Sequence, residues 1–378
     1  MPLPRVIPAR LLQEGEQALR LCNACRYCEG FCAVFPAMER RTAFSEQDLN
    51  YLANLCHDCG ECLYSCQYAP PHEFALHLPR TLAAIRTESY HKYAWPAAFS
   101  GLFRNTRLAV LLSVVAIPAL FVLLTLLAAG PSRFFAAHSV AEGSFYAVIP
   151  HAVMVTMFGI AGLFALIALK AGVAAFWKDL GEPWRALLSP RALRQAAWEA
   201  LRLRYLDGGG DGCTYPGEVQ SNARRRFHHL TFYGFLLCFA STSVAAFYHN
   251  VLGWTAPYPL LSLPVVLGTL GGFGLLIGPA GLLWLKRARD VERAAGAQDA
   301  MDTAFLLLLF LTGLTGLLLL LLRETAAMAL TLTIHLGLVL GLFVTMPYGK
   351  FVHGFYRFAA LVRNVQEQRR AAAGPGPG

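Results

Sequence analysis

Eight cysteines in two short runs are the residues of this chain best suited to chemistry. The runs CNACRYCEGFC and CHDCGECLYSC share the spacing C-x2-C-x2-C-x3-C. Thiolates at this spacing wrap a cubane iron–sulfur cluster, and the fourth cysteine of each run usually binds the other cluster. We therefore expect two 4Fe-4S clusters. The first ligand set is Cys22, Cys25, Cys28 and Cys66, and the second is Cys56, Cys59, Cys62 and Cys32.

Two other uses of clustered cysteines fit this pattern less well. Disulfide frameworks belong to small secreted chains in oxidising compartments. Structural zinc sites are built from pairs of cysteines and do not need a third and a fourth cysteine in each run. One detail departs from the bacterial ferredoxin pattern, in which a proline directly follows the last cysteine. Here the prolines come later, at Pro36 and Pro70, and the other two cysteines, Cys213 and Cys238, are expected to be structural.

The composition divides the chain into a polar head and an apolar body. Of the 378 residues, 56% are hydrophobic and only 15% are charged, which is unusual for a soluble domain. The cysteine-rich start carries no apolar signal region, and Ser45 and Asp48 form a capping-box-like helix start. Six apolar stretches of spanning length follow, at 108–129, 147–170, 230–250, 263–285, 303–322 and 328–348. We predict an all-α fold, with a small helical two-cluster, ferredoxin-like domain over 1–95 and a six-helix transmembrane bundle over 96–378.

The basic residues predict the orientation of these spans. Lysine and arginine concentrate in the loop 171–228, after the fourth span and after the sixth, whereas the opposite loops hold only Arg133 and Arg323. Positive residues mark the cytoplasmic side of a membrane protein. Both termini, the loop 171–228 and the cysteine runs are therefore expected in the cytoplasm, with the spans in a bacterial inner membrane. The net charge of +9 reflects this asymmetry, and no basic run suggests nucleic acid.

Four histidines at the ends of the third and sixth spans are candidate haem ligands. Because these spans run in opposite directions, His228 and His353 fall at the inner end, and His249 and His335 at the outer end. His335 and His353 are 18 residues apart, which is five whole turns of a continuous helix, so both would face the same way. We predict a cytochrome b-like bundle with an inner haem held by the first pair and an outer haem held by the second.

Two further histidines leave alternatives open. His229 lies about 160° out of phase with His249 on one helix, so His228 is the better inward-facing ligand. His151, at the outer start of the second span, could replace His249 or His335 as a ligand, or it could bind a quinone.

Three segments carry a resemblance to a known family. The segments CNACRYCEGFCAVFPAMERR, NLCHDCGECLYSCQYAPPHEFA and RRRFHHLTFYGFLLCFAST closely resemble the tricarballylate (citrate) utilisation protein B family, along nearly the whole chain. The last helix also resembles the cytochrome b subunits of membrane nitrate reductases and heterodisulfide reductases, where two histidines bracket a segment similar to Pro347–Lys350.

The resemblance implies an electron-transfer function. Members of the family reoxidise a soluble, FAD-containing dehydrogenase that converts tricarballylate to cis-aconitate, and they pass the electrons to the quinone pool. A similar module occurs fused to a flavoprotein of the cobalamin pathway, and the sequence does not choose between these flavoprotein partners. The resemblance therefore implies an oxidoreductase subunit whose substrate is dehydrogenated on the partner.

The position of the quinone follows from the order of the predicted cofactors. If electrons pass from an inner to an outer haem, the quinone binds near the outer leaflet. The residues expected there are His151, Tyr248, Trp254 and Tyr258. The alternative is an inner site near His229 and Lys350.

Two readings of lower rank remain. The glycine-rich segment Asp207–Cys213 is either a flexible loop or a docking loop for the flavoprotein. An iron–sulfur redox sensor or a transporter would show charged residues inside the spans, and we expect no acidic residue there.

Overall fold

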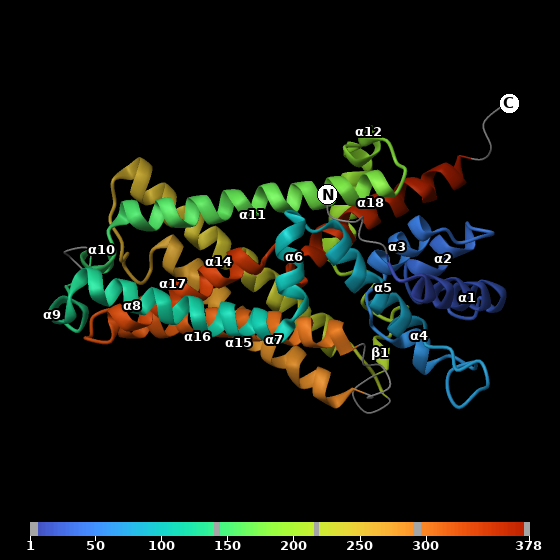
Figure 1. The fold of residues 1–378 in the computed structure, drawn as a ribbon, viewed down its shortest axis with the longest axis horizontal. Helices are drawn as coiled ribbons and strands as arrows, with labels where there is room; N and C mark the ends of the chain where they lie inside the picture. Colours follow the sequence, from blue (N-terminus) through green and yellow to red (C-terminus); the bar gives the residue numbers. More distant parts are fainter. Residues whose placement is uncertain (1–6, 140–143, 215–218, 290–295, 374–378) are drawn as a thin grey trace.

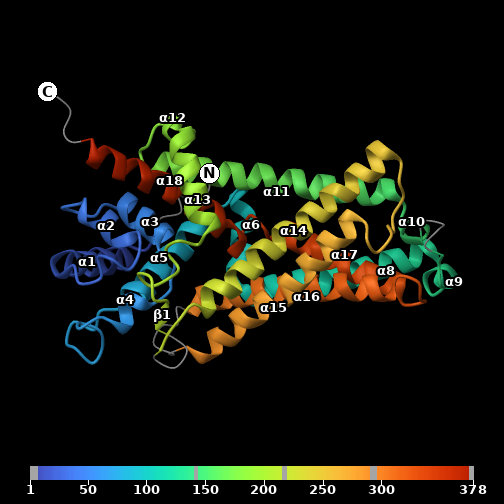
Figure 2. The same cartoon turned by 180° about the vertical axis from the view of Figure 1, so that it is seen from behind.

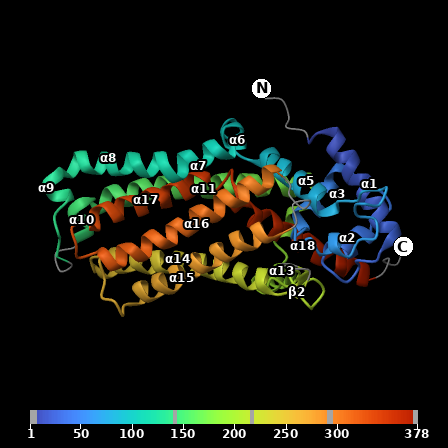
Figure 3. The same ribbon diagram turned by 90° about the horizontal axis from the view of Figure 1, so that it is seen from below.

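A computed structural model describes residues 7–139, 144–214, 219–289 and 296–373, and it is almost entirely helical. Long helices lie side by side along the long axis of the molecule, and shorter helices gather at one end (Figure 1). Figure 3 shows the same division from another side. Six helical segments are long and apolar enough to cross a membrane. The predicted all-α fold with a small head and six spans is therefore confirmed.

The head is built from five short helices whose apolar faces meet. Ser45 begins the third of them with a true capping box, because its hydroxyl accepts the N–H of Asp48 while the Asp48 carboxylate accepts the N–H of Ser45. Leu49 and Leu52 on one helix and Ile85 on another lie in the core. The five helices are α1 (Ala9–Cys25), α2 (Val34–Glu39), α3 (Glu46–Leu55), α4 (Glu61–Tyr64) and α5 (Leu78–Tyr93).

The six spans mostly extend beyond the apolar stretches of the sequence. The first is a stack of three segments, α7 (Thr106–Val110), the π-helical turn η1 (Leu111–Ala116) and α8 (Ile117–Ala129). The others are α11 (His151–Asp179), α14 (Ala223–Leu252), α15 (Leu263–Ala288), α16 (Gly296–Leu322) and α17 (Met328–Thr345). One expectation is wrong as a result. Because α16 begins earlier than predicted, Asp299 and Asp302 lie within this span, at its end nearest the head.

Glycines bring α14 and α15 into close contact. A Cβ atom added to Gly274 would lie 2.8 Å from Cα of Gly234, and one added to Gly271 would lie 2.7 Å from the backbone nitrogen of Cys238. Small residues let two helix backbones approach each other within a membrane, where packing replaces the hydrophobic effect as the driving force. The two helices therefore form the tightest pair of the bundle.

Shorter elements connect the spans at both ends. At the end near the head they are α6 (Ala97–Arg104), α12 (Trp184–Leu187), α13 (Pro190–Leu201) and the antiparallel pair of β1 (Cys213–Thr214) and β2 (Gln220–Ser221). At the far end they are α9 (Pro131–Phe134) and α10 (Ser144–Val148). The predicted loop 171–228 is thus largely folded in its described part.

The sixth span is interrupted before His353. α17 ends at Thr345, a turn follows, and the short 3-10 helix η4 (Lys350–Val352) leads into α18 (His353–Ala372). The phase argument that joined His335 to His353 assumed one continuous helix, and that assumption is wrong. α18 leaves the bundle and runs beside the head, which Figure 2 shows from behind.

Ion pairs fasten the head to the rest of the molecule. Arg41 of the head contacts Asp48 at 2.6 Å and Glu367 of α18 at 2.5 Å, and all three side chains are largely buried. Lys92 contacts Asp179 at the end of α11, with 2.9 Å between the nitrogen and the oxygen. The cysteine runs are therefore held in place against the inner ends of the spans.

Candidate iron–sulfur and haem sites

The second predicted ligand set surrounds a small cavity in the head. Cys32, Cys56, Cys59 and Cys62 all line a space of about 20 Å³, closed by Leu78, Pro79, Leu82 and other apolar side chains. Cys59 is buried and the other three are partly buried. Cys32 comes from the first cysteine run, so the exchange of the fourth ligand between runs is built into the fold.

The first predicted ligand set is also brought together. Burial and the neighbouring thiols of Cys66, Cys28 and Cys25 raise the pKa of Cys22 to about 12. Burial, the thiols of Cys66 and Cys25 and the carboxylate of Glu61 raise the pKa of Cys28 to about 12. Such thiols ionise readily only beside a cation, and iron supplies that charge in a cluster.

The four thiols of each set are the soft ligands that iron–sulfur clusters need. Among the described residues, no three histidine, cysteine or acidic side chains come close enough to hold one ion. A zinc ion draws four sulfurs to about 2.3 Å from one centre. A cubane instead places one cysteine at each of four iron corners, which spreads the sulfurs further apart. The donor chemistry of these thiols suits iron–sulfur clusters.

The inner histidines face each other across α14 and α18. The ring centroids of His228 and His353 are 6.4 Å apart. A metal bound by two imidazole nitrogens at about 2 Å each separates the ring centroids by about 6 Å. The two rings thus leave room for one iron between them. His353 thus lies opposite His228 as predicted, although the prediction assumed a continuous helix from His335 to His353 and the chain is interrupted between them.

The hydrogen bonds of His353 suit a metal ligand. Its Nδ1 lies 2.7 Å from the carbonyl oxygen of Lys350, which places the proton on Nδ1 and leaves Nε2 as the acceptor. Metal-ligating histidines usually donate their second N–H in this way. Nδ1 of His228 is buried without a hydrogen-bond partner in the described residues. His229 instead faces the carbonyls of Leu201 and Arg202, away from this pair.

At the outer end, the structure stacks His249 on His151. The ring centroids are 3.6 Å apart at an angle of 27°, and Tyr146 packs edge-on against both rings. This separation is too small for an iron between the two rings, for which about 6 Å is needed. His151 and His249 are therefore not an axial pair in this arrangement.

His335 lies on α17 and has its own partner. Its Nδ1 is 3.0 Å from the hydroxyl of Thr315. A Cβ atom added to Gly316 would lie 3.1 Å from the imidazole, so glycine makes room for this ring. No contact between His335 and His249 occurs in the part of the chain described. Nε2 of His335 is free to bind a metal, as it is in His353.

The other residues expected near an outer quinone mainly contact one another. Tyr248 packs edge-on against Trp254 at 4.8 Å and against Tyr258 at 5.5 Å. The hydroxyl of Tyr258 donates to the carbonyl of Ala245 at 3.0 Å. Tyr248, Trp254 and Tyr258 thus pack on one another, whereas His151 stacks on the candidate haem ligand His249.

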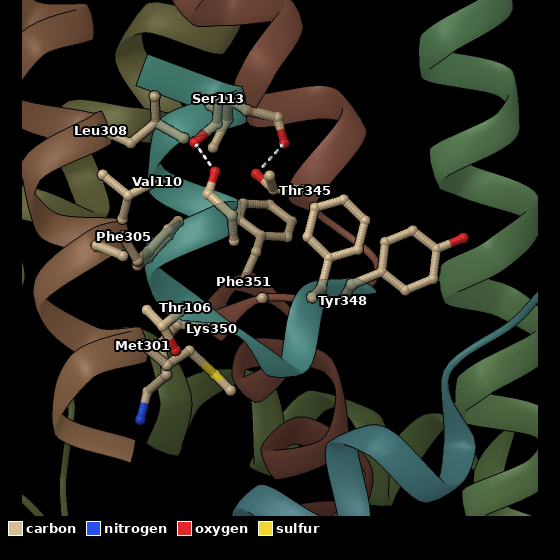
Figure 4. A pocket seen from close by; sticks show the side chains of 15 residues that line it. Thr106, Val110, Ser113, Met301, Phe305, Leu308, Thr345, Tyr348, Lys350 and Phe351 are labelled. Atoms are coloured by element: carbon tan, nitrogen blue, oxygen red, sulfur yellow. Dashed lines mark hydrogen bonds between the residues drawn. The ribbon is translucent and has the colours of Figure 1, made fainter. Parts of the chain in front are cut away.

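A second cavity lies between the first span, mainly its segment α7, and the helices α16 and α17. It measures about 40 Å³ and is lined mainly by apolar side chains such as Val110, Phe305 and Leu308 (Figure 4). Lys350 lies at its edge and pairs with Asp302 at 2.7 Å. A buried ion pair at a membrane boundary is costly, and such pairs commonly mark functional sites. Of the two residues expected at the alternative, inner quinone site, Lys350 lines this cavity and His229 is not among its lining residues.

The glycine-rich segment lies against the cysteine runs. A Cβ atom added to Gly209 would lie 3.4 Å from the carbonyl of Gly30. Cys213 contacts Cys59 of the second ligand set, and the next residue, Thr214, donates two hydrogen bonds of 2.7 Å to Glu61. Gly208, Gly209, Gly210 and Gly212 all have positive φ values, which glycine adopts without strain. This segment packs against residues of both cysteine runs.

Three charged or polar residues at the junction of head and bundle were missed from the sequence. Arg224 donates to the carbonyls of Asp58 and His57, at 2.6 and 3.4 Å. Arg357 contacts the imidazole of His57. Each arginine is four residues from an inner histidine, and that spacing was the signal that could have revealed them.

Comparisons with known proteins agree along the whole chain. The family model described as citrate utilization protein B matches residues 101–374, and the model of its Fer4-like domain matches residues 15–92. A curated citrate utilization protein B of Escherichia coli is 50% identical over 370 residues, which are 97% of this chain and 96% of that protein. No solved structure matches the chain.

Proposed function

The chain belongs to the citrate utilization protein B family, and from this premise we propose that it carries electrons from a reduced flavoprotein to a membrane quinone. The proposed carriers are two 4Fe-4S clusters in residues 1–95 and b-type haem in residues 96–378. When bound, these groups each accept and release one electron at a time. The Fer4-like match over the head supports an iron–sulfur electron-transfer role.

One observation carries the proposal, which is the order of the sites along the molecule. Around the first ligand set, Ala24, Arg26 and Tyr27 are exposed, and Tyr27 is 69% exposed. The second set is more enclosed, and His57 of its run contacts the helix that carries His353. This arrangement supports a route from a cytoplasmic surface, through the head, to the inner end of the bundle.

In this scheme the protein's own side chains hold the proposed cofactors and keep water away from them. The eight thiolates hold the irons, and the apolar side chains around the second cavity exclude water from them. His228 and His353 are the proposed axial ligands of the inner haem, and the carbonyl of Lys350 orients His353. Asp302 and Lys350 form the ionisable pair nearest that site.

We keep His249 and His335 as the proposed ligands of an outer haem. The hydroxyl of Thr315 orients His335 for ligation, while His151 packs on the outer side of His249. An acceptor quinone at this end would meet His151 and Tyr146. The cavity beside Lys350 supports the alternative inner site, so the experiment described below tests both locations.

The proposed donor is a soluble FAD-containing dehydrogenase on the cytoplasmic side, and the family name points to a tricarboxylic acid as its substrate. Tricarballylate is the substrate that we propose, with a different flavoprotein, of the cobalamin-pathway type, as the alternative. The bacterial inner membrane, with the head in the cytoplasm, is the proposed location. The basic residues near the head support this orientation.

A spectroscopic titration tests the function. Purified protein mixed with a dithionite-reduced flavoprotein should develop b-type haem bands, and adding a quinone analogue should reverse them. His151→Ala should slow the reversal if the quinone binds at the outer end, with both haems retained. His229→Ala serves as the probe of the inner end. A protein without any b-type haem spectrum, or one whose clusters stay oxidised in the presence of the reduced flavoprotein, would refute the proposal.

A further inference from the structure

Positive charge gathers where the head meets the inner histidine pair. Arg86 donates to the carbonyl of Cys56 at 2.6 Å and to the side chain of Gln298 at 2.8 Å. Gln298 in turn donates to the carboxylate of Asp58 at 2.8 Å. Arg224 and Arg357 add two more guanidinium groups to the same region.

Two acidic side chains of the described residues here contact other cations. Asp302 pairs with Lys350 at 2.7 Å, and Asp58 lies 3.8 Å from Arg86. Within the described residues, Arg357 has the imidazole of His57 as its hydrogen-bonding partner, and this partner carries no negative charge of its own. A partly buried guanidinium beside a neutral ring is expensive unless a carboxylate or a phosphate completes the site.

The two arginines occupy equivalent places relative to the inner histidines. Arg224 is four residues before His228 on α14, and Arg357 is four residues after His353 on α18. Residues four apart lie on the same face of a helix. In each case the arginine lies on the side nearer the head, so two guanidinium groups flank the head-facing edge of the space between the rings.

The opposite edge of this space is apolar. Towards the middle of the bundle, Phe235 of α14 packs on Phe351 with 5.4 Å between the ring centroids. A b-type haem has two carboxylate side chains, and these cannot be buried against phenylalanine rings without a large cost. Among the described residues, Arg224 and Arg357 reach the His57–Asp58 segment on the side of the head, whereas Lys350, another cation beside His353, is paired with Asp302.

We propose that Arg224 and Arg357 bind the two propionate carboxylates of a haem held between His228 and His353, and press that edge against the His57–Asp58 segment of the second cysteine run. This inference rests on the proposed function, because it requires an inner haem. It makes Arg224 and Arg357 ligand-binding residues, and it makes His57 the residue that joins the second cluster to the haem edge. It predicts that electrons reach the haem from the second cluster.

Substitution of each arginine, followed by a redox titration of the haem, tests the inference. In Arg357→Gln and Arg224→Gln, the midpoint potential of the inner haem should fall, because reduction adds an electron that the nearby cation no longer stabilises. Arg357→Lys should recover most of the potential, since it keeps the charge. Arg226→Gln and Arg369→Gln are matched controls on the same two helices, because both arginines are exposed, and both variants should titrate like the unmodified protein.

A second measurement separates propionate binding from a purely structural role. Protein produced without haem is reconstituted with haem or with its dimethyl ester, which lacks the carboxylates. The unmodified protein should prefer haem by about tenfold or more, the value expected for one charge-assisted hydrogen bond. Arg357→Gln and Arg224→Gln should each reduce this preference, while Arg226→Gln keeps it.

The outcomes are distinguishable. Equal potentials and an unchanged preference for haem over its ester in both variants, with iron and sulfide contents intact, would overturn the inference and leave the proposed function standing. A purely structural role would also overturn the inference. In that case both glutamine variants lose their clusters, Arg357→Lys has a normal potential, and the unmodified protein binds haem and its dimethyl ester equally well. Absence of any b-type haem from the unmodified protein would refute the proposed function itself.

Discussion

Each cysteine of the two runs has a defined place, so single substitutions have specific consequences. Cys59 lines the second cavity and is buried, and a serine hydroxyl is a poor ligand for iron. Cys59→Ser should therefore lose one cluster, seen as about half of the iron and acid-labile sulfide, and should stop reduction of the haem by the flavoprotein. Cys238→Ser, in the membrane helix α14, is the control and should keep both clusters. Full iron and sulfide contents in Cys59→Ser would contradict the ligand assignment.

The haem ligands give a second prediction for single residues. His353→Ala should remove the inner haem and about half of the total haem, because the partner of His228 across the 6.4 Å gap is lost. His335→Ala should remove the outer haem and leave the inner one reducible by the flavoprotein. A pyridine haemochrome assay, normalised to iron–sulfur content, measures both. If His151→Ala loses the outer haem and His249→Ala does not, the outer pair must be reassigned.

Helix-to-helix contacts determine what the elements tolerate, and the glycines between α14 and α15 are the clearest case. In Gly274→Ala the new methyl group would meet Cα of Gly234 at 2.8 Å, and a backbone atom cannot move aside as a side chain can. We expect a loss of about 1–3 kcal/mol of stability. Gly159→Ala on α11 is the control, because no atom lies within 4 Å of the added Cβ, and alanine favours a helix by about 1 kcal/mol. Thermal unfolding in detergent should show opposite shifts for the two variants, and equal shifts would contradict this packing.

The sequence anticipates elements well wherever a local pattern decides them. Apolar stretches of spanning length identify all six spans, and Ser45 with Asp48 identifies the start of α3. Contacts between distant segments are less accessible. The break after Thr345 has no strong local signal, because glycine at 349 and proline at 347 are tolerated within membrane helices. The four-residue spacing indicates that Arg224 and Arg357 lie beside the inner histidines, but their contacts with His57, like the stack of His151 on His249, depend on how helices pack.

For the whole molecule, ion pairs between the head and α18 hold the cysteine runs in a fixed position relative to His353, which α18 carries. Glu367 accepts from Arg41 and Arg363, and its side chain is only 12% exposed. Glu367→Gln removes the negative charge that these arginines share and leaves Arg41 with Asp48, and Arg363 with Glu182, as their remaining acidic partners, which should cost about 1.5–3 kcal/mol. Glu324→Gln is the matched control, because Glu324 is 67% exposed and lies at the far end, and it should cost less than about 1 kcal/mol. Limited proteolysis should release the head from the first variant alone, and equal resistance of the two variants would contradict this role.

The late position of α18 in the chain also has a consequence for biosynthesis. The head leaves the ribosome before the spans, whereas the helix that packs beside it follows all six spans in the chain. At 5–20 residues per second, this interval lasts roughly 10–50 s. Throughout that time the face of α3 that later packs on α18 is uncovered, and so is the side of His57 that Arg357 later contacts. The proposed second cluster therefore has an interval for assembly before α18 covers this side of the head.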